Sequence, residues 1–413
     1  MMSRHDGTAR RHLSLFIFQD SNGCAILGRH ISGSLTSMKV SVTQEQLAKG
    51  LGIVSRIVGV REPLQVLQNV LITTEDSRLK IAAMNREISI STYIGAKVDR
   101  EGGVTLPAKT FTELVSYLSN ERVDLTLDST TQTVNLRCGR TNSNVRGIAA
   151  TEFPPLPEPT EPDVVLSGRE LKAMITQTVF ASAREDNRPI LTGLYTRFEG
   201  DAMTMAAADG FRLAVRTTRI DSNFKKPREF VVPARAMAEV ARIIVDEDKE
   251  VGISLPDERD MVLFYVENTV LSANLLEGKF PDFSVIIPKS YVTAVHVYTQ
   301  DMLRDCKRAE VFARDNHDAA RIIVKPPQSA GSAGELTITA RSSERGDSEN
   351  TLEAHVEGEP LEVSFNIHYL LDVLNAMPGE QLIVESAGPA AAGVLRPAES
   401  DNLLYVIMPM ANR

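Results

Sequence analysis

Residues 164–183 read VVLSGRELKAMITQTVFASA, in which a short alternating strand leads into an amphipathic helix. The same order occurs at 40–59, as VSVTQEQLAKGLGIVSRIVG, and at 295–314, as VHVYTQDMLRDCKRAEVFAR. All three helices carry a leucine at an equivalent position: Leu47, Leu171 and Leu303. One unit that recurs in the same order predicts tandem copies of a single domain.

The later part of each copy repeats as well. Stretches typical of antiparallel hairpins follow the first helix at 67–91 and 191–215, and their counterpart at 320–340 has a longer Pro/Gly/Ser loop. Each copy then has a second strand-to-helix segment, at 104–118, 230–244 and 363–377. The residues that open these second helices are Pro107, Pro233 and Asn366, which lie 126 and 133 residues apart. This spacing supports a repeat over a chance likeness.

The repeats also predict the domain boundaries. FPPLPEPTEP at 153–162 contains five prolines, which neither a helix nor a strand ladder accommodates, so it is interpreted as a stiff linker. We expect a poorly ordered extension at 1–37 and three domains, at 38–160, 161–288 and 289–413. With two helices and about eight short strands in each copy, the predicted class is α+β, its helices packed on antiparallel sheets.

The composition and the missing motifs exclude several classes of function. The 45 Lys+Arg are outnumbered by 54 Asp+Glu, and the net charge of −9 excludes a uniformly basic nucleic-acid surface, although not a locally basic face. The three cysteines and seven histidines show no metal-ligand spacing, and motifs such as GxGxxG, GxxxxGK(S/T) and GxSxG do not occur. We therefore expect no catalytic residue, no metal and no cofactor.

The sequence also predicts a cytoplasmic protein with no membrane partner. No apolar run is long enough to cross a bilayer, which needs about 18 residues or more. The hydrophobic segment LSLFIF at 13–18 is too short for a signal peptide.

Five segments carry a more specific signal: MKVSVTQEQL (38–47), AAADGFRLAV (206–215), KFPDFSVIIP (279–288), SFNIHYLLDVLNAM (364–377) and YVIMPM (405–410). In these segments the chain resembles the bacterial β sliding clamps, the processivity subunits of DNA polymerase III. The resemblance runs in order from Met38 to the C-terminus. It implies a ring-forming DNA clamp, a head-to-tail homodimer whose six domains surround double-stranded DNA without regard to sequence.

The resemblance further implies a non-catalytic subunit of the DNA polymerase III holoenzyme, which as a whole is a DNA-directed DNA polymerase and nucleotidyltransferase. The implied partners are the polymerase III catalytic subunit, the clamp loader and other proteins that carry a clamp-binding motif. The alternative is a three-domain peptide-binding scaffold that does not encircle DNA. Retention on circular DNA, with release on linearisation, would separate the two.

Basic residues recur where a sliding ring would need them. Such a ring must hold phosphates by charge and read no bases, because base contacts would stop it at one sequence. The candidates lie in the first helices, near the start of the second helices, or in the loops between: Lys49, Arg61, Lys109, Lys172, Arg188, Arg235 and Arg304, with His368 in the third copy. Alternatively, they are ordinary solvated side chains. Their recurrence in the repeats supports DNA contact by the basic residues as a group more than by any single one of them.

The resemblance also implies a hydrophobic groove between the second and third domains, which receives a short motif with a glutamine and large apolar residues. The matching positions are Arg188, Ile190, Leu191, Ala208, Gly210, Phe211, Leu213, Pro281, Val285, Ile286, Asn366, Tyr369, Val406, Met408 and Met410. Its expected floor is Leu191, Leu213, Ile286, Val406 and Met408. Ala208, Phe211 and Val285 replace a common threonine, histidine and arginine. Taken singly, the aliphatic residues could equally fill cores.

The same resemblance implies that the first domain of one chain pairs with the third domain of another. The expected contact joins the edge strand at 142–147, including Ser143 and Val145, to the helix end at Val311 and Phe312. Ser143 stands where an aromatic residue is expected, so the apolar share of this contact is reduced.

Overall fold

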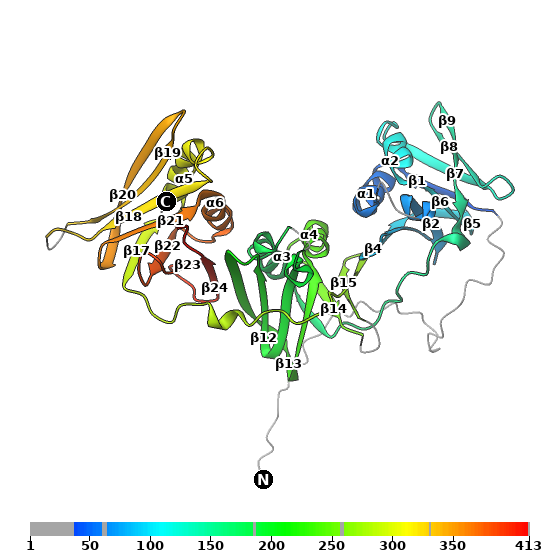
Figure 1. Cartoon of the computed structure of the whole chain (residues 1–413). Coiled ribbons are helices and arrows are strands. Elements are labelled where there is room, and N and C mark those ends of the chain that lie inside the picture. The colour runs from blue at the N-terminus through cyan, green and yellow to red at the C-terminus, as the bar shows by residue number, and fades with distance from the viewer. Residues whose placement is uncertain (1–36, 60–63, 185–186, 257–259, 330–331, 412–413) are drawn as a thin grey trace, which may run out of the picture. The chain divides into compact units, whose positions relative to one another are not determined.

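The computed structural model describes residues 37–59, 64–184, 187–256, 260–329 and 332–411 (Figure 1). Within these ranges the α-helices form three pairs, one in each sequence repeat: α1 (Gln44–Val54) with α2 (Ala108–Ser116), α3 (Gly168–Thr176) with α4 (Ala234–Ile243), and α5 (Thr299–Ala313) with α6 (Ile367–Ala376). Short 3₁₀ turns are Ser55–Ile57, Gln65–Gln68, Ala150–Glu152, Val179–Ala181, Pro189–Thr192 and Phe283–Val285. The expected extension, apart from Ser37, and the candidate Arg61 lie outside the described residues.

The helices begin where the repeats predict. Pro107 and Pro233 are the N-cap residues of α2 and α4, where a missing N–H leaves no helical hydrogen bond unmade. Asn366 is the N-cap of α6, and its side chain accepts hydrogen bonds from the amides of His368 and Tyr369. The three equivalent leucines of the first helices are all buried. The sequence repeat is therefore a structural repeat.

Two sheets involve the first repeat. A five-stranded sheet has the order β5 (Lys97–Arg100), β1 (Lys39–Thr43), β7 (Arg122–Asp128), β8 (Thr133–Cys138) and β9 (Thr141–Arg146). A nine-stranded sheet has the order β10 (Ile148–Ala149), β6 (Gly103–Pro107), β2 (Asn69–Glu75), β3 (Arg78–Met84), β4 (Ile88–Gly95), β16 (Thr269–Asn274), β15 (Met261–Val266), β14 (Glu250–Ser254) and β11 (Val164–Ser167). The β4–β16 pairing joins the first repeat to the second, and Ser89 and Ser272 share a buried hydrogen bond of 2.7 Å across it.

A ten-stranded sheet joins the second repeat to the third. Its order is β12 (Gly193–Ala208), β13 (Arg212–Pro233), β24 (Leu403–Ile407), β23 (Gly393–Pro397), β22 (Gln381–Ser386), β17 (Thr293–Tyr298), β20 (Gly346–Gly358), β19 (Gly334–Ser342), β18 (Ala319–Lys325) and β21 (Leu361–Asn366). The expectation of short strands throughout is wrong for β12 and β13, which have 16 and 22 residues. Their pairing shifts register between Phe198 and Gly200 and again between Gly200 and Ala202, and the two strands continue past these irregularities.

All described strand pairs are antiparallel, and the helices pack against the sheets. None of the helices in the described ranges combines the length and apolar character needed to cross a membrane.

Candidate functional site: an apolar groove and basic helix faces

The C-terminal strand returns to the second repeat. In the β13–β24 pairing Leu213 lies opposite Val406, and in the β23–β24 pairing Val406 lies opposite Val394. Directly opposed side chains on one face of a sheet touch. The C-terminal segment therefore pairs with a strand of the second repeat.

A hydrophobic cluster forms around this pairing, separate from the main core, and is called the groove cluster below. Its buried members are Leu191, Tyr195, Ala206, Leu213, Val215, Val231, Phe280, Val394 and Val406. Partly buried Ile190 and Ala208 pack against it. Burial raises the pKa of Tyr195 to about 12, helped by a hydrogen bond of 2.8 Å to Glu229. The cluster draws its members from both the second and the third repeat.

Large apolar side chains remain exposed beside the groove cluster. Phe211, Val285, Ile286 and Met408 are 63%, 76%, 47% and 45% exposed. Ile286 and Met408, which are expected in the floor, are thus about half exposed, unlike Leu191, Leu213 and Val406. Ile286 follows a 3₁₀ turn and Met408 follows the end of β24, so neither side chain is held in a sheet. These four exposed side chains are called the apolar rim below, and Leu191, Leu213 and Val406 are buried members of the groove cluster.

The hairpin tip between β12 and β13 carries part of this rim. Oδ1 of Asp209 accepts hydrogen bonds from the amides of Phe211 and Arg212 at 2.9 and 3.0 Å, and Gly210 has φ +94°. The chain therefore reverses at Asp209–Gly210, between β12 and β13. The amide of Met408 donates to the carbonyl of Phe211 at 2.8 Å, so the C-terminal segment is fastened to the tip.

Arg212 is a buried cation that sequence reasoning missed. Its Nε donates to Asp209 at 3.0 Å, its Nη1 to Asp372 at 2.6 Å, and its Nη2 to the Phe180 carbonyl at 2.7 Å. The guanidinium also lies 4.5 Å from the centre of the Tyr369 ring. The available signal was an arginine inside the apolar alternation of FRLAV. Arg212 joins β13 to α6 beneath the hairpin tip.

The remaining groove candidates belong either to the second or to the third repeat. Asn366 caps α6, and the amide of Met410 donates to the Ser364 carbonyl of β21 at 2.8 Å, so both belong to the third repeat. Arg188 and Pro281 are exposed residues of the second repeat. Burial raises the pKa of Tyr369, and the nearby carboxylate of Asp209 adds to this.

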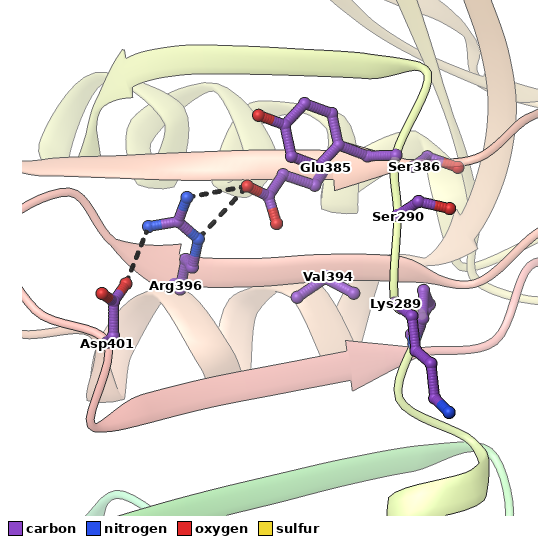
Figure 2. A pocket seen from close by; sticks show the side chains of 9 residues that line it. Lys289, Ser290, Glu385, Ser386, Val394, Arg396 and Asp401 are labelled. Carbon is purple, nitrogen blue, oxygen red and sulfur yellow. Dashed lines mark hydrogen bonds and ion pairs between the residues drawn. The ribbon is translucent and has the colours of Figure 1, made fainter.

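A polar pocket adjoins the groove cluster (Figure 2). It has a volume of about 290 Å³ and is lined by Pro288, Lys289, Ser290, Tyr291, Glu385, Ser386, Val394, Arg396 and Asp401. Val394 belongs both to this pocket and to the groove cluster. The hydrogen bond to Glu385 raises the pKa of Arg396, which is therefore a fixed cation.

The basic candidates differ in their surroundings. Lys49, Lys109 and Arg235 are exposed on α1, α2 and α4 and form no ion pair with another described residue. Lys172 is held by Glu247 at 2.9 Å and donates to the Ile244 carbonyl, and Arg304 pairs with Asp301 at 2.6 Å. Together the helices of the described residues carry nine basic and eight acidic side chains, one net positive charge, against −9 for the chain. The acidic excess therefore lies outside the helices.

The expected dimer residues are only partly available. Val311 is 51% exposed at the end of α5, whereas Phe312 is partly buried against its own core. The assignment of the Val145 side chain to the dimer contact is wrong. This side chain is 7% exposed and packs in the core of its own chain, because alternate residues of β9 face opposite sides of the sheet. Ser143 is partly buried, and β9 is the edge strand of its sheet.

Among the described residues, no group of three or more His, Cys, Asp or Glu side chains could hold a metal ion.

Comparison with known proteins gives matches along nearly the whole described chain. Family models for the DNA polymerase III beta subunit match residues 38–157 (N-terminal domain), 165–282 (central domain) and 284–411 (C-terminal domain). The beta sliding clamp of Synechococcus elongatus is 30% identical, covering 91% of this chain and 100% of the relative. That of Bacillus subtilis is 28% identical, covering 90% and 99%.

Solved structures agree with these matches. The crystal structure of the DNA polymerase sliding clamp from Bacillus subtilis is similar with a TM-score of 0.85 at 26% identity, covering 91% of this chain and 100% of that one. A sliding clamp from Pseudomonas aeruginosa, solved with griselimycin bound, has a TM-score of 0.83 at 25% identity, with the same coverage.

Proposed function

The chain belongs to the DNA polymerase III beta subunit family, the beta sliding clamps, and on that premise we propose that it encircles duplex DNA and tethers a replicative polymerase to it. The observation that carries this proposal is the threefold repeat of a helix pair packed on sheets, found in clamp order along one chain. Family membership favours the clamp over a peptide-binding scaffold that leaves DNA alone.

In this proposal the protein is a non-catalytic cytoplasmic subunit, and nucleotidyl transfer belongs to the DNA polymerase III holoenzyme that it joins. Its three domains are 38–160, 161–288 and 289–413. Its partners are the polymerase III catalytic subunit, the clamp loader and other proteins with a clamp-binding motif. The apolar rim and the groove cluster receive that motif, since exposed apolar side chains over a buried floor suit an amphipathic peptide.

The DNA contact is electrostatic and unevenly distributed. Lys49, Lys109 and Arg235 are solvated and able to meet phosphates. Lys172 and Arg304 already neutralise carboxylates of the same chain, so they contribute less to DNA binding. Negative charge elsewhere on the protein disfavours DNA on the outer surface.

Ring closure uses two strand edges of opposite charge. The outer edge of β9 carries no strand within the described ranges, and Arg146 is exposed on it. The 346–354 half of β20 pairs with β19 alone among the described strands and exposes Asp347, Glu349 and Glu353. We propose that β9 of one chain pairs with this half of β20 in a second copy. A hydrogen bond of 2.7 Å from Ser342 to Asp315 holds the α5 end, and with it Val311, near the β19–β20 hairpin.

The test is retention on DNA of defined topology. Protein loaded on circular duplex DNA should stay bound at high salt and leave after linearisation. Substituting Lys49, Lys109 and Arg235 together with alanine removes six cations from the dimeric ring and should lower the log–log salt slope of DNA association by up to about 5. The matched control replaces three exposed strand lysines, Lys39, Lys97 and Lys325, and should leave the slope unchanged. Equal retention on circular and linear DNA would contradict encirclement.

A further inference from the structure

The floor of the groove continues across the third repeat as one row of paired residues. Leu213 lies opposite Val406, Val406 opposite Val394, and Val394 opposite Glu385. Paired positions place their side chains on the same face of a sheet. The row therefore begins with apolar side chains of the groove cluster and ends at a carboxylate.

That carboxylate lies in the polar pocket described above. Glu385 is 9% exposed, and its Oε1 accepts hydrogen bonds from Nη2 of Arg396 at 2.8 Å and from Nε at 3.2 Å. Both bonds go to the same oxygen, and Figure 2 draws none to the other. Among the described residues the side-chain hydrogen bonds of Glu385 all go to Oε1, so Oε2 can accept from a further donor.

The charges of the pocket are not balanced near Glu385. Arg396 also pairs at 3.3 Å with Asp401, so two carboxylates share one guanidinium, and the Asp401 side chain is 93% exposed, where water screens its charge. Lys289 lines the same pocket, but its ammonium group lies away from Glu385 and Arg396 in Figure 2. Tyr291, 49% exposed, adds an aromatic ring to the lining.

We propose that this pocket is a charged extension of the groove, which binds a lysine or arginine side chain flanking the apolar anchors of the partner peptide. The inference rests on the proposed peptide-binding function and adds a specificity element to it. From Val406 to Glu385 is two inter-strand spacings, roughly 10 Å. An extended peptide covers that distance in about three residues. The basic residue therefore stands about three positions from the nearest apolar anchor.

Other occupants suit the pocket less well. An anion would meet an arginine whose donors already serve two carboxylates. An apolar side chain would remove water from Oε2 of Glu385 and return no hydrogen bond. A cationic side chain donates to that oxygen and lies against an aromatic ring.

The experiment measures the affinity of three labelled peptides for the full chain. One carries only the glutamine–leucine–phenylalanine anchors. The second adds a lysine three positions before or after the anchors, each placement being made. The third adds norleucine at the same positions, which keeps length without charge. We expect one lysine placement to bind about fivefold tighter than its norleucine counterpart at low salt, and the gain to shrink as salt is added.

Glu385→Gln keeps an oxygen that can accept from Arg396 and removes the charge. It should abolish the gain from lysine and leave the affinity of the anchor peptide unchanged. The matched control is Glu380→Gln, an exposed glutamate one residue before β22, which should keep the gain. Equal binding of the lysine and norleucine peptides, or a gain that survives in Glu385→Gln, would overturn the extension alone. Failure of the anchor peptide to bind would overturn the groove and the extension together.

Discussion

Arg212 and Asp372 form an ion pair between two repeats, with Nη1 of Arg212 2.6 Å from Oδ2 of Asp372. Arg212 belongs to β13 in the second repeat, and Asp372 to α6 in the third. The arginine side chain is 5% exposed and also pairs with Asp209. One buried cation thus holds the hairpin tip and α6 together beside the groove.

Removing this cation should destabilise the chain. Arg212→Ala leaves the nearly buried carboxylate of Asp209 without its partner, and we expect the free energy of unfolding to fall by about 3 kcal/mol. Asp372→Asn should cost less, about 1 kcal/mol, because the Asp372 side chain is 39% exposed and water screens the pair. Urea unfolding followed by circular dichroism measures both. Equal losses for the two variants would argue against the assigned burial.

The apolar rim and the floor of the groove should respond differently to truncation. Ile286→Ala and Met408→Ala should each weaken a clamp-binding peptide by about 1–2 kcal/mol and leave stability nearly unchanged, because both side chains are about half exposed. Leu213→Ala, which opens a cavity in the groove cluster, should instead cost about 3 kcal/mol of stability.

Peptide titration and thermal melting of each variant separate the two effects. The control is Leu64→Ala, an exposed leucine of the first repeat, which should change neither quantity. Normal peptide affinity in Met408→Ala would remove Met408 from the binding surface.

Dimerisation should be sensitive to charge at the end of α5. Val311→Asp would place a carboxylate in the proposed interface. Desolvation of this buried, unpaired charge should reduce the free energy of dimerisation by several kcal/mol. Phe312 is a poorer choice, since its ring partly packs in its own core. Val245→Asp, at a valine that is 75% exposed in the second repeat, is the matched control. Sedimentation at low protein concentration should give a monomer for Val311→Asp only, and a dimer in both variants would relocate the interface.

Alkaline pH should weaken the groove cluster through Tyr195. Its pKa in the folded chain is about 12, raised by burial and by the Glu229 hydrogen bond from an ordinary value of about 10. Because the pKa is raised on folding, the neutral form of Tyr195 stabilises the folded state. This contribution to the free energy of unfolding is fully present below pH 10 and is lost as pH rises through about 12. Tyr195→Phe should lose the hydrogen bond, about 1 kcal/mol, and unfold with a weaker pH dependence above pH 10. Ultraviolet difference titration of the two proteins should show one late-titrating tyrosine missing, and identical curves would contradict the assignment.

Much of the architecture follows from local sequence. The helix starts at Pro107, Pro233 and Asn366 and the turn at Asp209–Gly210 are where residue type and spacing predict them. Caps and tight turns depend on a few neighbouring residues, so their signal survives in a single sequence. The groove residues came from resemblance, and of its expected floor Leu191, Leu213 and Val406 are buried.

Only the tertiary structure decided which candidate side chains are available. Leu213 and Val406 are 193 positions apart, yet their pairing builds the groove and extends it to Glu385. Val145 turns inward and Lys172 is bound by Glu247 through register and packing that no short window contains. A strand exposes one face or the other according to its partners, and a surface charge is free only if no distant carboxylate reaches it. The repeat, the helix starts and the turns were therefore determined by the sequence alone, because their interactions are local. The groove floor, the buried Arg212 and the polar pocket were decided by contacts between segments that only folding brings together.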